Sequence, residues 1–199
     1  MSKWGMEDPE TLEAINKIGF KGKILNIAAG DGRFNSYLLK FADNVLAIDI
    51  SETDLKVLQT NCPKNFENKL KIQIVDITKT FPFENDEFDG IFFTGTLHLF
   101  NINIIKDIIK EIIRVLKPNG KIIIDFATDI IRLDKNGNKI IFNDEGNYNK
   151  EDSITFFKKV FKDFDLKIDI FKFEEKNLEA DAGYQSITGN FLLISGIKN

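Results

Sequence analysis

The hydrophobic positions along the chain alternate between short apolar runs and stretches with helical spacing. Apolar runs predict five strands, at about residues 23–28, 44–50, 71–75, 88–94 and 121–126. Helical spacing predicts helices at about residues 9–18, 33–41, 51–62 and 104–116, and the last has a wide isoleucine stripe. Asp8 is the expected N-cap of the first helix, with Pro9 at its first position. Strands and helices that alternate in this way predict a parallel sheet with helices on both faces.

The rhythm changes after the fifth predicted strand. The dipeptide Asn136-Gly137 lies between two partly apolar runs, which is the strongest short signal of a β-hairpin. We therefore expect a hairpin insertion at about residues 130–147. A helix at about residues 150–161 and two strands, at about 166–173 and 189–195, complete the pattern.

Composition narrows the class of protein. The 199 residues are 43% hydrophobic and 29% charged, which is typical of a globular protein, and we expect a single domain over residues 1–199. The net charge of -4 argues against a nucleic-acid-binding protein. One cysteine and one histidine argue against a disulfide framework and against a Cys/His metal site. Because no stretch has the pattern of a signal peptide or a membrane span, we expect a cytoplasmic protein.

The segment KILNIAAGDGRF, residues 23–34, carries the first chemical signal. Its apolar run ends in a turn containing Gly30 and Gly32, where backbone N–H groups can face a nucleotide. Asp49 ends the next strand about 20 residues later, where a carboxylate can accept both ribose hydroxyls. Asp76 and Ile77 end the third strand, within reach of a base edge. Each signal alone has an ordinary structural interpretation, because glycines form turns and aspartates cap helices. Three of them at successive strand ends favour a nucleoside pocket.

The same turn distinguishes between cofactors. A dinucleotide-binding motif needs a third glycine, which lets the helix pack closely and lets the pyrophosphate of the ligand approach the helix N-terminus. The residue at the position of this third glycine is Arg33 here. The first glycine of the motif is replaced by Ala28. The sequence therefore disfavours an NAD-dependent oxidoreductase.

Several segments together resemble the class I S-adenosylmethionine-dependent methyltransferases, of the small-molecule type that includes quinone-biosynthesis enzymes. These segments lie between about residues 20 and 128, and they are NIAAGDG, LAIDIS, VDITKTFPFENDEFDGI and VLKPNGKIIIDF. The resemblance implies a Rossmann-like seven-stranded sheet, mostly parallel, whose last strand is antiparallel and fits residues 189–195. It also implies S-adenosylmethionine as cofactor and S-adenosylhomocysteine as product.

The resemblance assigns the cofactor-binding residues. They are Asn26, Ala28, Ala29, Gly30, Gly32, Asp49, Ile50, Asp76, Ile77 and Thr94. Two of them depart from the family pattern. Asn26 replaces the usual acidic residue, so it can bind the cofactor's ammonium group only without a full charge. Ala28 replaces the usual first glycine, and we expect it to have φ below zero, because a side chain disfavours the left-handed region.

Methyl transfer is an in-line displacement that depends mainly on alignment and on exclusion of water. His98 follows the fourth predicted strand, and it is a candidate general base expected to titrate near pH 7. Alternatively, His98 hydrogen-bonds the backbone or stacks on the acceptor.

The acceptor is expected to be a small molecule. The Asn/Asp-Pro-Pro-aromatic motif of amino-methylating DNA enzymes is absent, because Thr94-Gly95-Thr96-Leu97 follows the fourth strand. Acceptor choice is expected to depend on the predicted hairpin and on residues 175–188. A module that binds S-adenosylmethionine without turnover and acts through a partner is the alternative function.

Overall fold

The protein forms a mixed sheet with the strand order β3-β2-β1-β4-β5-β8-β7, and β6 pairs with β5 outside this path. The computed structural model describes residues 7–142, 145–176 and 183–199. The first five strands pair in parallel, as the sequence predicts. These strands are β1 (Lys23–Ile27), β2 (Asn44–Asp49), β3 (Leu70–Ile74), β4 (Phe88–Phe93) and β5 (Leu116–Leu133).

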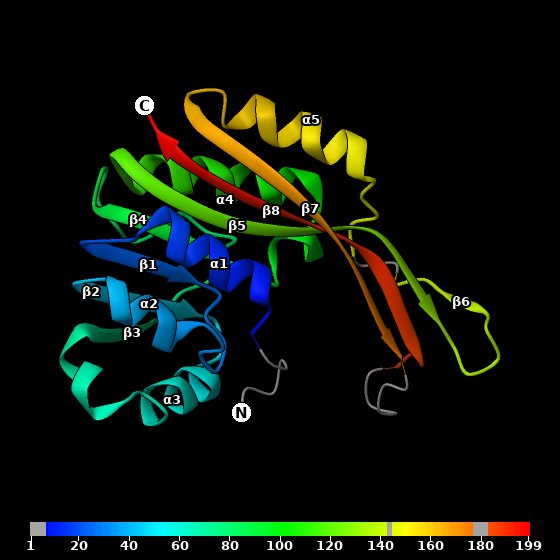
Figure 1. Cartoon of the computed structure of the whole chain (residues 1–199), viewed down its shortest axis with the longest axis horizontal. Coiled ribbons are helices and arrows are strands. Elements are labelled where there is room, and N and C mark those ends of the chain that lie inside the picture. The colour runs from blue at the N-terminus through cyan, green and yellow to red at the C-terminus, as the bar shows by residue number, and fades with distance from the viewer. Residues whose placement is uncertain (1–6, 143–144, 177–182) are drawn as a thin grey trace.

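The remaining strands form an antiparallel edge of the sheet. Strand β8 (Ser186–Lys198) lies between β5 and β7 (Phe164–Lys176) and is antiparallel to both. This arrangement confirms the predicted mostly parallel sheet with an antiparallel last strand. Figure 1 shows β5, β7 and β8 extending together beyond the parallel part of the sheet, next to the short strand β6 (Lys139–Ile140).

Helices cover both faces of the sheet (Figure 1). On one face, Ile15 and Leu38 pack into the same core cluster as Val45. On the other face, Ile108 and Phe157 pack with Ile124. The helices of the first face are α1 (Pro9–Ile18), α2 (Asn35–Phe41) and α3 (Glu52–Thr60), and those of the second are α4 (Ile102–Val115) and α5 (Lys150–Val160). Among the described residues, no helix has the length and apolarity needed to cross a membrane.

Local sequence signals set several of these boundaries. The Asp8 side chain accepts a hydrogen bond from the Thr11 N–H at 2.8 Å and caps α1 as predicted. The Ser51 hydroxyl accepts one from the Asp54 N–H at 3.2 Å and caps α3. Both caps satisfy N–H groups that have no partner inside the helix, so the helices begin where the sequence places them.

The hairpin predicted around Asn136-Gly137 is present, with β5 and β6 as its two arms. Gly137 has a φ of 82°, which explains the glycine at this turn. The turn is longer than the two-residue type, since the Asp134 N–H donates to the Asn138 carbonyl at 2.9 Å across it. The Asp134 carboxylate also accepts hydrogen bonds from the N–H groups of Asn136 and Asn138. The side chain of Asp134 therefore stabilises the turn.

Candidate functional site

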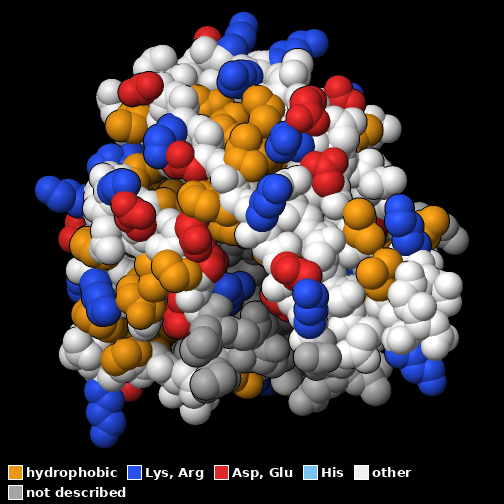
Figure 2. All heavy atoms as spheres, turned by 45° about the vertical axis from the view of Figure 1, so that its right-hand side comes forward, with side chains coloured by type: hydrophobic (Ala, Val, Ile, Leu, Met, Phe, Trp, Pro, Cys, Tyr) orange, Lys and Arg blue, Asp and Glu red, His pale blue; other side chains and the backbone are white. Residues whose placement is uncertain are grey.

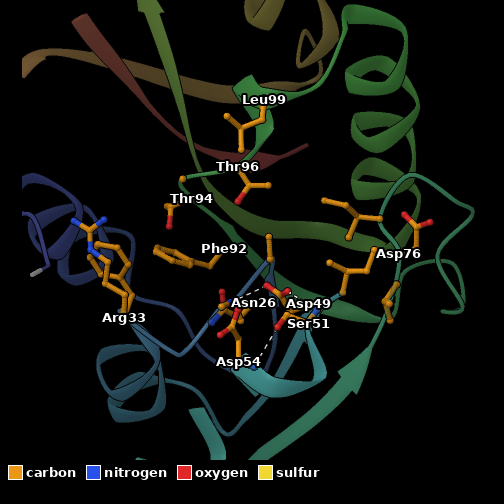
Figure 3. Close-up of a pocket in the computed structure, with 18 of the residues that line it drawn as sticks. Asn26, Arg33, Asp49, Ser51, Asp54, Asp76, Phe92, Thr94, Thr96 and Leu99 are labelled. Carbon is orange, nitrogen blue, oxygen red and sulfur yellow. Dashed lines mark hydrogen bonds between the residues drawn. The ribbon is translucent and has the colours of Figure 1, made fainter. Parts of the chain in front are cut away.

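A cavity of about 590 Å³ lies at the carboxyl ends of the parallel strands. This volume is in the range of ligand-binding pockets, roughly 300–1,000 Å³. Residues that follow β1, β2, β3 and β4 form its wall, because parallel strands end at the same edge of the sheet. Figure 3 shows Asn26, Asp49, Ser51 and Asp54 grouped on one side and Thr94, Thr96 and Leu99 on the opposite side.

The structure brings together nine of the ten residues that the sequence assigned to cofactor binding. Gly32 is the exception. With a φ of 93° it turns away from the cavity toward α3, where an added Cβ would lie 2.8 Å from the Cγ of Leu58. Gly32 is therefore needed for the turn and for helix packing, and it does not line this cavity. The nine residues in the cavity wall are Asn26, Ala28, Ala29, Gly30, Asp49, Ile50, Asp76, Ile77 and Thr94.

The turn after β1 folds sharply over the end of β2. The Ala29 N–H donates to the Ile48 carbonyl at 2.9 Å, which pulls the chain across the neighbouring strand. Ala28 adopts a φ of 50° to make this turn, so the expectation of a negative φ was wrong. A non-glycine residue in this region costs about 1–3 kcal/mol, and such strained residues are enriched at functional sites.

Asp49 connects the glycine turn to the start of α3. One carboxylate oxygen accepts a hydrogen bond from the Gly30 N–H at 2.8 Å, and the other accepts one from the Ser51 N–H at 2.8 Å. Each carboxylate oxygen can accept a further hydrogen bond. Asp49 is half-buried and faces the cavity, so it can still accept hydroxyl groups from a ligand (Figure 3).

An apolar surface adjoins this carboxylate. Ile50 is 70% exposed although it lines the cavity, and Val75 and Ile77 lie in the same wall. Exposed apolar side chains in a cavity suit a flat, weakly polar ligand group such as a nucleobase. Asp76 accepts hydrogen bonds from the Thr78 hydroxyl at 2.6 Å and the Thr78 N–H at 3.0 Å, which hold the pKa of its carboxyl below the ordinary value.

His98 lies outside the cavity wall, in a short turn of 3-10 helix over Leu97–Leu99. Its ring packs edge-on against Phe126, with centroids 6.3 Å apart. Burial, aided by the charge of Arg132, lowers the pKa of His98 to about 4. The expectation that His98 titrates near pH 7 is therefore wrong, and its ring is neutral at that pH. A base role for His98 stays a prediction.

Two charged residues at the site were not assigned by the sequence analysis. Arg33 lines the cavity and forms an ion pair with Asp8 at 3.3 Å. Asp125 lies on β5, and its Oδ1 accepts a hydrogen bond from the N–H of Gly95, a cavity residue, at 2.7 Å. Burial raises the pKa of Asp125 to about 7. The sequence signal that could have identified Asp125 is its position as the one carboxylate inside the apolar segment KIIIDF.

Comparisons with known proteins identify the family of the chain. A family model described as a methyltransferase domain matches residues 25–124, half of the chain. A demethylmenaquinone methyltransferase of Leptospira interrogans is 31% identical over 100 residues, which cover 49% of this chain and 39% of that protein. The chain thus spans about two fifths of the length of that curated relative.

Solved structures share the fold. The YcgJ protein of Bacillus subtilis is 13% identical with a TM-score of 0.73, and the match covers 96% of this chain and 99% of that one. The complex of DhpI with SAH is 16% identical with a TM-score of 0.63, and its match covers 92% of this chain and 82% of that one. At these identities the likeness establishes the arrangement of the strands and helices.

Proposed function

The chain belongs to the class I S-adenosylmethionine-dependent methyltransferases, and on this premise we propose that it transfers a methyl group from S-adenosylmethionine to a small-molecule acceptor. The observation that carries the proposal is the cavity at the strand ends, whose wall contains nine residues that the resemblance assigns to the cofactor. Because the chain matches only part of its curated relatives, the activity is inferred from this site.

The residues present fit the cofactor. Asp49 has acceptor capacity for the ribose hydroxyls, and the exposed Ile50 offers an apolar face to the adenine. Asp76 and the backbone of Ile77 are assigned to the adenine edge. Asn26 and the Thr94 carbonyl are assigned to the methionine end, where the cofactor supplies a methyl group on a positively charged sulfur.

The protein's own contribution to the reaction is alignment and exclusion of water. Phe92, Leu99 and Phe100 are in the cavity wall, and Figure 3 shows Leu99 on the side where Thr94 and Thr96 lie. Apolar side chains there exclude water from the reacting groups and hold the acceptor in line, which accounts for much of the rate enhancement in such a transfer.

A small acceptor is favoured over nucleic acid or protein. On the face shown in Figure 2, Lys and Arg side chains are interspersed with Asp and Glu. Nucleic-acid binding depends on clustered basic residues, so this face does not suit it. The relative named for demethylmenaquinone supports a small acceptor of some kind. The β5–β6 hairpin and residues 175–188 are assigned to acceptor choice, and residues 177–182 of this loop lie outside the described part of the chain.

We expect S-adenosylmethionine and S-adenosylhomocysteine to stabilise the protein and NAD to leave it unchanged. A ligand at a hundredfold excess over its Kd adds about 2.7 kcal/mol to the free energy of unfolding. For a chain of this size, the melting temperature should rise by roughly 5–10 °C, measured by differential scanning fluorimetry. A rise with NAD and none with either sulfur ligand would refute the proposal. A silent binding module would show the same rise but no turnover in an acceptor screen.

Asp49→Ala is expected to weaken binding of S-adenosylhomocysteine more than it weakens the fold. Loss of a charged acceptor for the ribose hydroxyls should cost on the order of 1.5–3 kcal/mol, roughly a 10- to 150-fold rise in Kd. The change also leaves the N–H groups of Gly30 and Ser51 without their acceptor, which loosens the turn. Isothermal titration calorimetry measures the Kd, with the exposed Asp107→Ala on α4 as control. An unchanged Kd in a folded variant would remove Asp49 from the site.

A further inference from the structure

The proposed function leaves one carboxylate at the edge of the cavity without a role. In the register of the sheet, Phe93 of β4 lies opposite Ile124 of β5, so Asp125 lies beside the residues that follow β4. Its Oδ1 accepts a hydrogen bond from the Gly95 N–H at 2.7 Å. Gly95 is in the cavity wall, between Thr94 and Thr96. Asp125 is therefore hydrogen-bonded to the wall segment that contains Thr94 and Thr96, and Figure 3 shows these two threonines on the side of the cavity opposite Asp49.

The surroundings of Asp125 leave its charge poorly compensated. On β8 the residue opposite is Leu193, and the flanking residue Ile124 is fully buried. Within the described part of the chain, the charges that act on Asp125 come from Asp8, which precedes α1, and Arg33, which precedes α2. Asp8 and Arg33 carry opposite charges and form an ion pair with each other, so the one raises and the other lowers the pKa of Asp125. Burial is the largest influence, and it raises the pKa of Asp125 to about 7.

We propose that Asp125 is the proton-carrying group of this site, and that binding of the positively charged cofactor favours its ionised form. The inference rests on the proposed function. A positive charge near a carboxyl group favours its ionised form, so loading of the methyl donor would release the proton. S-adenosylhomocysteine has a neutral sulfur and lacks this effect.

An ionised Asp125 has a defined use in methyl transfer. A hydroxyl or amine acceptor must lose a proton, and the bonding electrons then remain on its oxygen or nitrogen. Asp125 Oδ1 keeps its hydrogen bond from Gly95, and Oδ2 is the atom that accepts this proton. His98 is less suited, because its low pKa makes it a weak base.

Proton release on binding tests the inference without knowledge of the acceptor. Calorimetric titrations of the full chain at about pH 7, in phosphate and in Tris, give the number of protons released with each ligand. The wild type should release about half a proton more with S-adenosylmethionine than with S-adenosylhomocysteine, because about half of the Asp125 carboxyls are protonated there. Asp125→Asn should release equal numbers with both ligands. Its amide oxygen can still accept the Gly95 hydrogen bond, so the variant should fold.

The outcomes are distinct. Equal proton release with the two ligands in the wild type would overturn the inference, and so would a difference that persists in Asp125→Asn. Failure of both ligands to bind the wild type would refute the proposed function itself. If the variant does not fold, carboxyl ¹³C NMR of the wild type labelled at aspartate decides. One carboxyl resonance should titrate near pH 7 without ligand and at lower pH with S-adenosylmethionine. A spectrum in which no carboxyl titrates in this way would refute the inference.

Discussion

Asp125→Asn is expected to make the protein increasingly more stable than the wild type as the pH rises from about 4 to 8. The pKa of Asp125 is raised to about 7 in the folded protein, whereas an unfolded aspartate titrates near 3.9. The folded state therefore binds the Asp125 proton more tightly than the unfolded state does. In the wild type, the stabilisation from this bound proton is fully present below about pH 4 and is lost by about pH 7. Asparagine keeps the acceptor for Gly95 but cannot ionise.

The size of this effect follows from the shift. A difference of about three pKa units corresponds to about 4 kcal/mol. The free energy of unfolding of Asp125→Asn, relative to that of the wild type, should therefore rise by about 4 kcal/mol from pH 4 to pH 8. Urea unfolding at a series of pH values measures it. Asp165→Asn, at an exposed position on β7, is the matched control and should follow the wild-type curve. A constant difference between Asp125→Asn and wild type would mean that Asp125 ionises normally.

His98→Gln is expected to change acid stability in the opposite direction. The folded pKa of His98 is about 4, below the value of 6.5 for an unfolded histidine. The stability that depends on the neutral ring is therefore fully present above about pH 6.5 and is lost as the pH falls to about 4. Glutamine has no such titration, so the variant should gain about 3 kcal/mol relative to the wild type over this range.

The single histidine of the chain makes this second test specific, because no other imidazole titrates in the same window. As the pH falls from about 7 to 4, the wild type loses stability through His98 and gains stability through Asp125, so the two effects partly cancel. Each variant should thus reveal the contribution of the other residue. Curves for His98→Gln and wild type that stay parallel across this window would show that the ring is accessible to protons in the folded state.

The sequence alone predicted the parallel half of the sheet and nine of the residues that line the cavity. Alternation of apolar runs with helical spacing predicted β1 to β4 and their helices, and Asp8 and Ser51 marked helix starts that the structure confirms. These features depend on short-range chemistry, which is written in neighbouring residues. Asp49 reached the cavity because any residue that ends a parallel strand lies at the same edge.

Strand length was decided by the tertiary structure. The apolar run predicted a strand at about residues 121–126, but β5 extends to Leu133. Its last residues pair with β8, beyond a bulge between Thr128 and Ile131. A strand continues for as long as its neighbour supplies hydrogen bonds, and that neighbour lies more than 50 residues away in the chain.

The conformations and charges at the site were also decided in three dimensions. Ala28 has a positive φ because the turn must bond to the Ile48 carbonyl of another strand. The pKa values of Asp125 and His98 are displaced because segments distant in the chain surround these half-buried side chains and remove water from them. Burial and electric field are sums over all surrounding groups, so no short stretch of sequence contains them. The sequence named residues at the ends of the first four strands, but only the packed structure showed that Asp125, which the sequence analysis did not assign, has a pKa of about 7.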